Sequence, residues 1–175
     1  MPVPTCSSAS FLLREITSAD VKFIQTLTQT EGWLQNIGPR GTETEEGALA
    51  YIERAYTLPY REKGYGLWGI ECLERHVLVG VNGILHRPGI EVPELGFALL
   101  PEEAGKGWIQ QTGTCILAHA KNVLHFPLLD AYANVDNARS RTSLNRLGFH
   151  EIQCGKHPSF DADVCHARIQ LFQTS

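Results

Sequence analysis

Two glycines flanking a lysine, Gly105 and Gly107, stand directly before a stretch with helical periodicity. Apolar or small residues recur at three- and four-residue spacing from Trp108 to Val123, which predicts a helix with one buried face. The first turn of a helix has backbone N–H groups without partners, and glycine lets an anion approach them closely. The turn is therefore a candidate phosphate site, and the alternative is an ordinary strand–turn–helix connection.

Two strands flank this helix in the sequence. Residues 94–100 are mostly apolar, as in a strand covered on both faces, and Pro101 ends the strand because proline cannot donate to a ladder. Residues 128–135 are the second predicted strand. They lead directly into a helix at residues 137–147, which Gly148 ends as a C-cap. The candidate phosphate turn thus lies between two strands that must be positioned around it.

The rest of the chain supplies further strands and helices. The other strands are expected at residues 10–16, 66–72, 76–86, 149–154 and 165–171, and the other helices at residues 21–28 and from residue 42 or 44 to about 60. Pro59 marks the expected end of the latter helix, and residues 31–41 form a loop or a short helical turn. Gly80 and Gly83 indicate a bulge or a close backbone approach. The order predicts an α/β fold, a mixed sheet with helices on both faces.

Length and composition limit the class of protein. With 175 residues, 43% of them hydrophobic, the chain can bury a sizeable core, and we expect a flexible tail at residues 1–9 and a single domain at residues 10–175. A net charge of −4 argues against broad binding to nucleic acid or anionic membranes. No apolar run approaches the roughly 18 residues of a membrane span, and the N-terminus lacks the pattern of a secretory signal.

The cysteines are odd in number and scattered, which predicts reduced thiols in a cytoplasmic protein. They are Cys6, Cys72, Cys115, Cys154 and Cys165. The two near the C-terminus have His157 and His166 beside them but lack the spacing of metal ligands. We therefore expect no metal.

Four short motifs occur in order along the chain. They are ELGF at residues 94–97, GKGW at 105–108, ANVDNARS at 133–140 and LGF at 147–149. As an ordered set they make the sequence resemble the GCN5-related N-acetyltransferases, most of all the branch that includes the acetyltransferases of ribosomal-protein N-termini. The resemblance covers roughly residues 11–173. It implies a mostly antiparallel mixed sheet of about six to seven strands in which two parallel strands, 94–100 and 128–135, splay apart.

The resemblance also implies acetyl-CoA as co-substrate, bound between the two splayed strands. Unpaired backbone groups of the first strand would pair with the amide-bearing pantetheine arm, and the amides that open the helix would hold the pyrophosphate. Asn137 would hydrogen-bond the arm, with a plain N-cap as its alternative role. The implied cofactor-binding residues are Phe97, Ala98, Leu99, Leu100, Gly105, Lys106, Gly107, Trp108, Ile109, Asn137 and Ser140.

The implied reaction is direct attack of a primary amine on a thioester in a ternary complex, which needs a base and an acid. Glu94 is the candidate base, and its alternative role is a structural ion pair. Ser140 is the candidate acid, because Leu144 stands where many members of the wider family have a tyrosine. The alternative for Ser140 is packing and hydrogen bonding at a helix start. A backbone amide near Ala98 is the candidate donor to the oxyanion.

The acceptor pocket of the family lies between the first two helices and the hairpin strands. The residues expected to bind the acceptor there are Trp33, Asn36 and His86. The acceptor itself, a protein N-terminus or a small-molecule amine, stays open. No nucleic acid or membrane partner is expected, and the chain is expected to be a monomer or a homodimer.

Three positions depart from the family's pattern at the pyrophosphate loop: Ala104, Ile109 and Gln111. Contacts made by the main chain need no particular side chain, so these departures weaken the prediction of cofactor binding without removing it. They keep a second function open, that of a catalytically impaired acyl-CoA-binding sensor.

Overall fold

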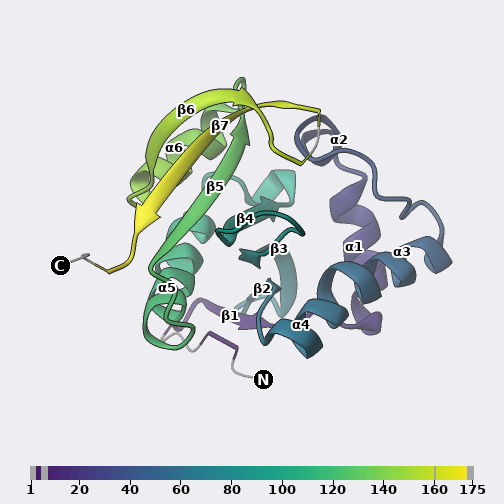
Figure 1. Ribbon diagram of the computed structural model, residues 1–175. Coiled ribbons are helices and arrows are strands. Elements are labelled where there is room, and N and C mark those ends of the chain that lie inside the picture. The colour runs from purple at the N-terminus through teal and green to yellow at the C-terminus, as the bar shows by residue number, and fades with distance from the viewer. Residues whose placement is uncertain (1–2, 5–7, 160, 173–175) are drawn as a thin grey trace.

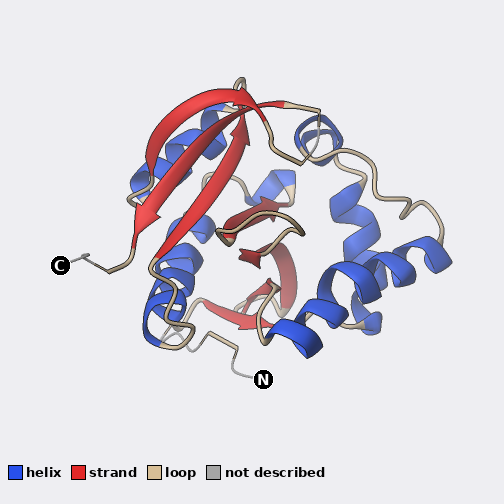
Figure 2. Cartoon of the chain, viewed as in Figure 1, coloured by secondary structure: helices blue, strands red, loops and turns tan. Residues whose placement is uncertain are grey.

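The computed structural model describes residues 3–4, 8–159 and 161–172, and its strands form one seven-stranded sheet in the order β1-β2-β3-β4-β5-β7-β6. Neighbouring strands are antiparallel except β4 and β5, which are parallel. This confirms the predicted mixed, mostly antiparallel sheet (Figures 1 and 2). The strands are β1 (Phe11–Arg14), β2 (Leu67–Cys72), β3 (Val77–Leu85), β4 (Glu94–Leu99), β5 (Leu128–Asn134), β6 (His150–Lys156) and β7 (Asp163–Gln170).

Helices lie on both sides of this sheet. Figure 1 shows α1 to α4 grouped on one side and α5 and α6 on the other. Two short 3-10 helices, η1 (Ser18–Asp20) and η3 (Pro101–Glu103), and one π-helical segment, η2 (Glu53–Thr57), connect or extend these elements. The helices are α1 (Val21–Thr28), α2 (Glu31–Asn36), α3 (Glu45–Ile52), α4 (Leu58–Lys63), α5 (Trp108–Asn122) and α6 (Ala138–Arg146).

The core joins the two layers of helices through the sheet. Trp68 of β2, Tyr56 of η2 and Phe149 before β6 are among its largest fully buried side chains. On α5 the residues Ile109, Thr112, Ile116 and Ala120, which recur at helical spacing, are buried as the sequence predicts, whereas Val123 lies just beyond the helix and is 48% exposed. A Cβ at Gly113 of α5 would meet the side chain of Leu147, so α5 and α6 pack closely.

The second long helix does not end at Pro59. Thr44 caps α3, but the chain stays helical through the π-helical segment η2 and α4 as far as Lys63, and Gly64 ends it with a φ of +80°. Leu58 donates its N–H to Glu53 O, a longer step than an α-helix uses, and Pro59 then lies at the start of α4. A proline is tolerated there because the first turn needs no N–H donor.

Gly80 and Gly83 of β3 lie where the sequence predicts a bulge or a close backbone approach, and the structure shows both. The register with β2 shifts between Ile70 and Glu71, leaving a bulge beside Gly80. A Cβ at Gly80 would lie 2.4 Å from Ala98 O, and one at Gly83 would lie 2.1 Å from Gly66 O. The neighbouring strands therefore approach β3 at distances that only glycine permits.

A disulfide overturns the prediction of reduced cysteines. Cys154 of β6 and Cys165 of β7 are paired directly across the two strands and are bonded, with their Cα atoms 4.0 Å apart. Cys115 is disulfide-bonded as well, Cys72 is free and buried, and Cys6 lies outside the described residues. The sequence could not reveal the pair, because the register of the β6–β7 hairpin, not a spacing motif, brings the two sulfurs together.

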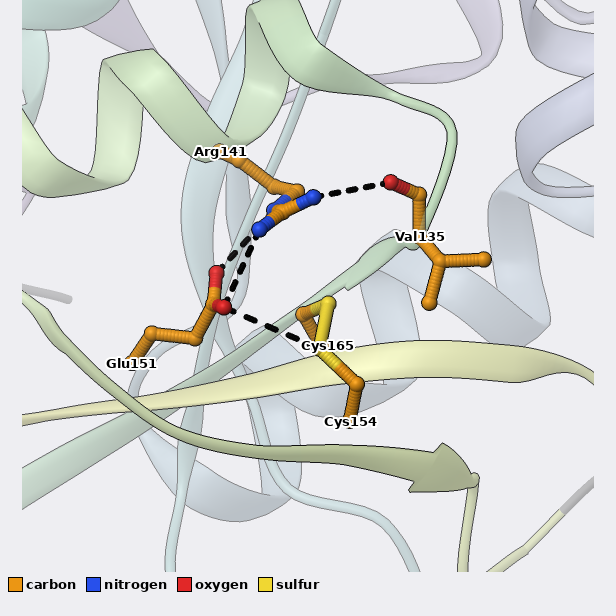
Figure 3. The surroundings of a disulfide bond; sticks show 5 residues. All are labelled: Val135, Arg141, Glu151, Cys154 and Cys165. Atoms are coloured by element: carbon orange, nitrogen blue, oxygen red, sulfur yellow. Dashed lines mark hydrogen bonds and ion pairs between the residues drawn. A yellow bond between two sulfur atoms is a disulfide. The ribbon is translucent and has the colours of Figure 1, made fainter.

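The disulfide lies beside an ion pair that connects this hairpin to α6. Figure 3 shows Glu151 next to the disulfide and facing Arg141. Arg141 donates two hydrogen bonds of 3.0 Å to the Glu151 carboxylate and a third, also 3.0 Å, to Val135 O. The start of α6 is thereby held to both β5 and β6.

None of the helices among the described residues combines the length and the apolar character needed to cross a bilayer.

Replacing Gly83 by alanine tests the close approach of β2 and β3. We expect Gly83→Ala to lower the free energy of unfolding by about 1–3 kcal/mol, because the added Cβ overlaps a backbone oxygen that cannot move alone. Gly155→Ala on β6 is the matched control, since a Cβ there meets nothing within 4 Å. Urea unfolding followed by circular dichroism measures both. Equal midpoints for the two variants would contradict the packing described.

Candidate active site

The strands β4 and β5 separate almost as soon as they meet. Their ladder contains one residue pair, Glu94 with Asp130, and Asp130 donates its N–H to Pro93 O over 3.0 Å. Beyond that pair the two strands run in diverging directions, as Figure 1 shows. The C-terminal part of β4 therefore has β3 on one side and a gap on the other.

The register with β3 determines which groups of β4 face this gap. Leu100 donates its N–H to Val79 O. In an antiparallel pair, residues that bond the partner strand alternate with residues whose backbone groups point away from it. Ala98 and Leu100 therefore direct their N–H groups toward β3. Phe97 and Leu99 direct their N–H and C=O groups into the gap.

The turn after β4 presents backbone amides. Gly105 and Gly107 both have a φ of +83°, in the left-handed region that glycine favours. Gly107 is the N-cap of α5, so the amides of Trp108 and Ile109 have no acceptor within the helix. A Cβ at Gly105 would meet nothing within 4 Å, so space is open on that side. The turn is built as an anion-binding site would be.

A buried carboxylate holds this turn in place. Glu103 is 2% exposed and accepts hydrogen bonds from Arg75 at 2.8 Å, from Trp108 Nε1 at 2.9 Å and from Lys106 at 3.2 Å. These bonds, that of Arg75 above all, lower the pKa of Glu103 to about 2. Glu103 thus joins the β2–β3 turn, the glycine turn and the first residue of α5. Lys106 is paired with Glu103, so part of its charge is already neutralised.

The start of α6 lies beside α2. The Asn137 side chain accepts a hydrogen bond from Ser140 N over 3.1 Å, which makes it the N-cap. Asn134, at the end of β5, lies 3.4 Å from Asn36 of α2. Asn36 and Asn137, predicted separately, meet at an open depression of about 550 Å³. It is lined by Gln35, Asn36, Asn134, Asp136, Asn137, Ala138 and Arg139.

Polar side chains of three strands share the face of the sheet that looks toward α2. We call this the polar face, and it consists of Glu94, Asp130, Tyr132, Asn134, His166 and Arg168. Arg168 binds the Asp130 carboxylate through two hydrogen bonds of 2.6 and 2.9 Å. His166 stacks on the Tyr132 ring, with centroids 4.8 Å apart.

Glu94 is buried on this face with one oxygen bonded and one not. Its exposed fraction is 3%, and Oε2 accepts a hydrogen bond from Arg87 over 3.1 Å. The other oxygen, Oε1, is buried without a hydrogen-bond partner among the described residues. Burial raises the pKa of Glu94, and the Arg87 guanidinium opposes this without cancelling it. The carboxylate therefore has both an unused acceptor atom and an increased affinity for a proton.

Comparison with known proteins identifies the family of this chain. A family model described as an acetyltransferase (GNAT) domain matches residues 10–150. The chain belongs to the GNAT acetyltransferase family. Among curated proteins, no sequence matches this chain significantly.

Solved structures of acetyltransferases share the whole architecture. RimL, a ribosomal-protein α-N-acetyltransferase in complex with coenzyme A, is 20% identical with a TM-score of 0.80 over 94% of this chain and 96% of that chain. The Salmonella typhimurium enzyme that modifies the N-terminal serine of a ribosomal protein is 19% identical, with a TM-score of 0.78 over 93% and 96%. A chimera of the Vibrio cholerae spermidine N-acetyltransferase SpeG and hSSAT is 17% identical, with a TM-score of 0.75 over 93% and 96%. At these identities the likeness shows the fold.

GNAT acetyltransferases use acetyl-CoA, and the described residues fit that group. The backbone groups of Phe97 and Leu99 face a gap and need partners, which an amide-bearing arm supplies. The amides of the glycine turn suit a pyrophosphate. The departures at Ala104, Ile109 and Gln111 leave these main-chain groups unchanged. The assignments of individual cofactor residues stay predictions.

The three residues predicted to bind the acceptor have different surroundings. Trp33 is buried, and its Nε1 donates a hydrogen bond to Gly38 O over 3.0 Å. Its side chain is therefore fixed in the protein interior. Asn36 lines the depression beside α6. His86 has both ring nitrogens engaged, Nδ1 with Tyr65 at 3.1 Å and Nε2 with Ile90 O at 2.9 Å. His86 therefore positions the β3–β4 loop that carries Arg87.

Three charged residues of this candidate site were not predicted from the sequence: Glu103, Asp130 and Arg168. A signal existed for Asp130, which is the one charged residue in the apolar strand at residues 128–135. No such signal marks Glu103, which follows another glutamate in a turn. Glu103 differs from Glu102 only in the folded structure, where it is buried and accepts hydrogen bonds from three side chains.

The buried carboxylate of Glu103 should make the free energy of unfolding depend on pH. Because the folded-state pKa of Glu103 is about 2 and its ordinary value is 4.5, the unfolded chain binds more protons between them. The stabilisation is fully present above the ordinary value and is lost as the pH falls toward the folded-state value. Glu103→Gln should cost about 1–3 kcal/mol at neutral pH and much less near the folded-state pKa. Urea unfolding across that range measures the difference. The exposed neighbour variant Glu102→Gln is the control, and a pH-independent cost for Glu103→Gln would contradict the assignment.

Proposed function

We propose that this chain is an acetyl-CoA-dependent N-acetyltransferase that transfers the acetyl group to a primary amine by direct attack within a ternary complex. The observation that carries the proposal is the gap between β4 and β5, which opens beyond the single pair of Glu94 and Asp130 and faces the amide-presenting turn. Acetyl-CoA supplies the acyl group as a thioester, and the residues around the gap bind, orient and exchange protons.

Binding uses main-chain groups at both ends of the gap. Phe97 and Leu99 pair with the pantetheine arm as an added strand would, and the amides from Gly105 to Ile109 hold the pyrophosphate. Asn137 and the depression beside α2 support the arm where the gap is widest. Lys106 adds little, since it is paired with Glu103.

Proton transfer is assigned to two residues at opposite sides of the gap. Glu94 takes a proton from the acceptor amine through Oε1, the oxygen that Arg87 leaves unbonded. Burial raises its pKa, which brings a carboxylate closer to the value that a base needs at neutral pH. Ser140, in the first turn of α6, returns a proton to the departing sulfur.

The acceptor is proposed as a class only. RimL is a ribosomal-protein N-acetyltransferase and SpeG acts on spermidine, and both share this fold. A primary amine, on a protein N-terminus or on a small molecule, fits the carboxylates of Glu94 and Asp130 on the polar face. We propose no metal for this reaction.

A ligand titration tests the first half of the proposal. Acetyl-CoA and coenzyme A, each at about one hundred times its Kd, should raise the Tm, because a ligand that binds only the folded state stabilises it by about 2.7 kcal/mol at that excess. Thiol release is then measured across a panel of peptides, polyamines and small amines. Absence of any Tm shift would contradict the proposal. A shift without thiol release would favour the acyl-CoA sensor.

Two substitutions test the proton-transfer roles. Glu94→Gln and Ser140→Ala should each lower kcat by about 10²- to 10⁴-fold while leaving the Kd for acetyl-CoA within a few-fold of wild type. Thr142→Ala, at an exposed position on the same helix as Ser140, is the matched control and should retain full turnover. Wild-type kcat in Glu94→Gln near neutral pH would remove Glu94 as the base.

A further inference from the structure

A proton balance shows that Glu94 and Ser140 leave one step without a residue. An amine that arrives as an ammonium ion loses two protons before it is a neutral amide N–H, one to expose its lone pair and one after the C–N bond forms. When the C–S bond breaks, the sulfur takes up one proton. The second proton must leave the site for solvent, and Glu94, on the polar face, is buried. The site therefore needs an exit for one proton per turnover.

His166 lies on the polar face, contacts Asp130 and is partly exposed to solvent. Its Nε2 atom is buried 3.0 Å from Asp130 Oδ2, an ion-pair distance without the angle of a hydrogen bond. Its ring is parallel to that of Tyr132 within 12°, and 17% of its side chain is exposed. Arg168 fixes Asp130 by two hydrogen bonds, so the carboxylate is held in position for an imidazolium.

The other groups around His166 are poor carriers of a proton at neutral pH. Arg87 and Arg168 remain charged, and Asp130 is bound by Arg168. Burial raises the pKa of Tyr132 and lowers the pKa of His157 to about 4. The groups around His166 are Glu94 from β4, Asp130 and Tyr132 from β5, Arg168 from β7, Gln153 from β6 and His157 from the β6–β7 loop. Arg87 from the β3–β4 loop binds Glu94.

We propose that His166, supported by Asp130, is the proton exit of the acetyltransferase site. It receives the proton that leaves the amine by way of Glu94 and releases it to solvent from the exposed part of its ring. The Asp130 carboxylate holds the imidazolium while the proton is in transit, and Tyr132 keeps the ring parallel to itself. This inference rests on the proposed function. It gives His166 and Asp130 the task of moving to solvent the proton that Glu94 takes from the amine.

The test compares pH profiles of wild type, His166→Gln and Asp130→Asn, with the amine that gives the fastest thiol release. If His166 carries the proton, the pH profile of His166→Gln should differ in shape from that of wild type. The variant should lose at least about tenfold in kcat at neutral pH with little change in KM for acetyl-CoA. At high pH, where more of the amine is already unprotonated, its kcat should approach that of wild type. Added imidazole buffer should restore part of the activity at neutral pH.

A structural role for His166 would give a different result. Loss of activity at every pH, without rescue by imidazole, would mean that the substitution only disturbs packing, and would overturn the proposal. Coenzyme A-induced Tm shifts show whether each variant is folded, and His166→Asn is the second variant if Gln is not tolerated. His125→Asn, an exposed histidine at the far end of α5 with a φ of 56° that asparagine accepts, is the matched control.

The two hypotheses fail in distinguishable ways. A wild-type protein that binds acetyl-CoA but releases no thiol with any amine overturns the proposed function and the proton exit together. An active wild type whose profile is shared by His166→Gln overturns the proton exit alone.

Discussion

The site depends on the parallel pairing of β4 and β5 stopping after one residue pair. A full ladder would bond the N–H and C=O groups of Phe97 and Leu99 and close the gap. Instead the pair of Glu94 and Asp130 ends the ladder, and the two strands diverge. Unbonded backbone groups inside a protein are costly, so the fold keeps them only where something else can bond them. The gap proposed for the cofactor is thus a consequence of an interrupted sheet.

The same residue pair concentrates charge at the closed end of the gap. Two carboxylates as close as Glu94 and Asp130 would repel each other, and each is compensated by its own arginine, Arg87 and Arg168. The compensation is unequal. Asp130 receives two hydrogen bonds, whereas Glu94 receives one and keeps a buried oxygen free. Burial raises the pKa of Glu94, and its unbonded oxygen can accept a proton, which suits a base.

The open end of the gap is organised by a different carboxylate. Glu103 fixes the first residue of α5 through the Trp108 indole and thereby sets where the helix amides point. Asn82 of β3 reaches the same turn, donating to Thr112, which in turn donates to Trp108 O. The helix N-terminus is held by side chains on both sides before any ligand binds. Such preorganisation reduces the entropy lost on binding.

Most of the elements, their order and the composition of the glycine turn can be predicted from the sequence, because helical and strand periodicity, proline and glycine act locally. The four motifs add to this because they occur in the same order as in a known family. Their resemblance to that family also predicts that Glu94, the glycine turn and Asn137 belong to one site. The tertiary structure alone decided the rest. It carried the α3–α4 helix past Pro59, bonded Cys154 to Cys165, and brought Asp130, His166 and Arg168 onto one face with Glu94. These outcomes follow from strand register and from contacts between segments far apart in the chain, which no local pattern of residues encodes.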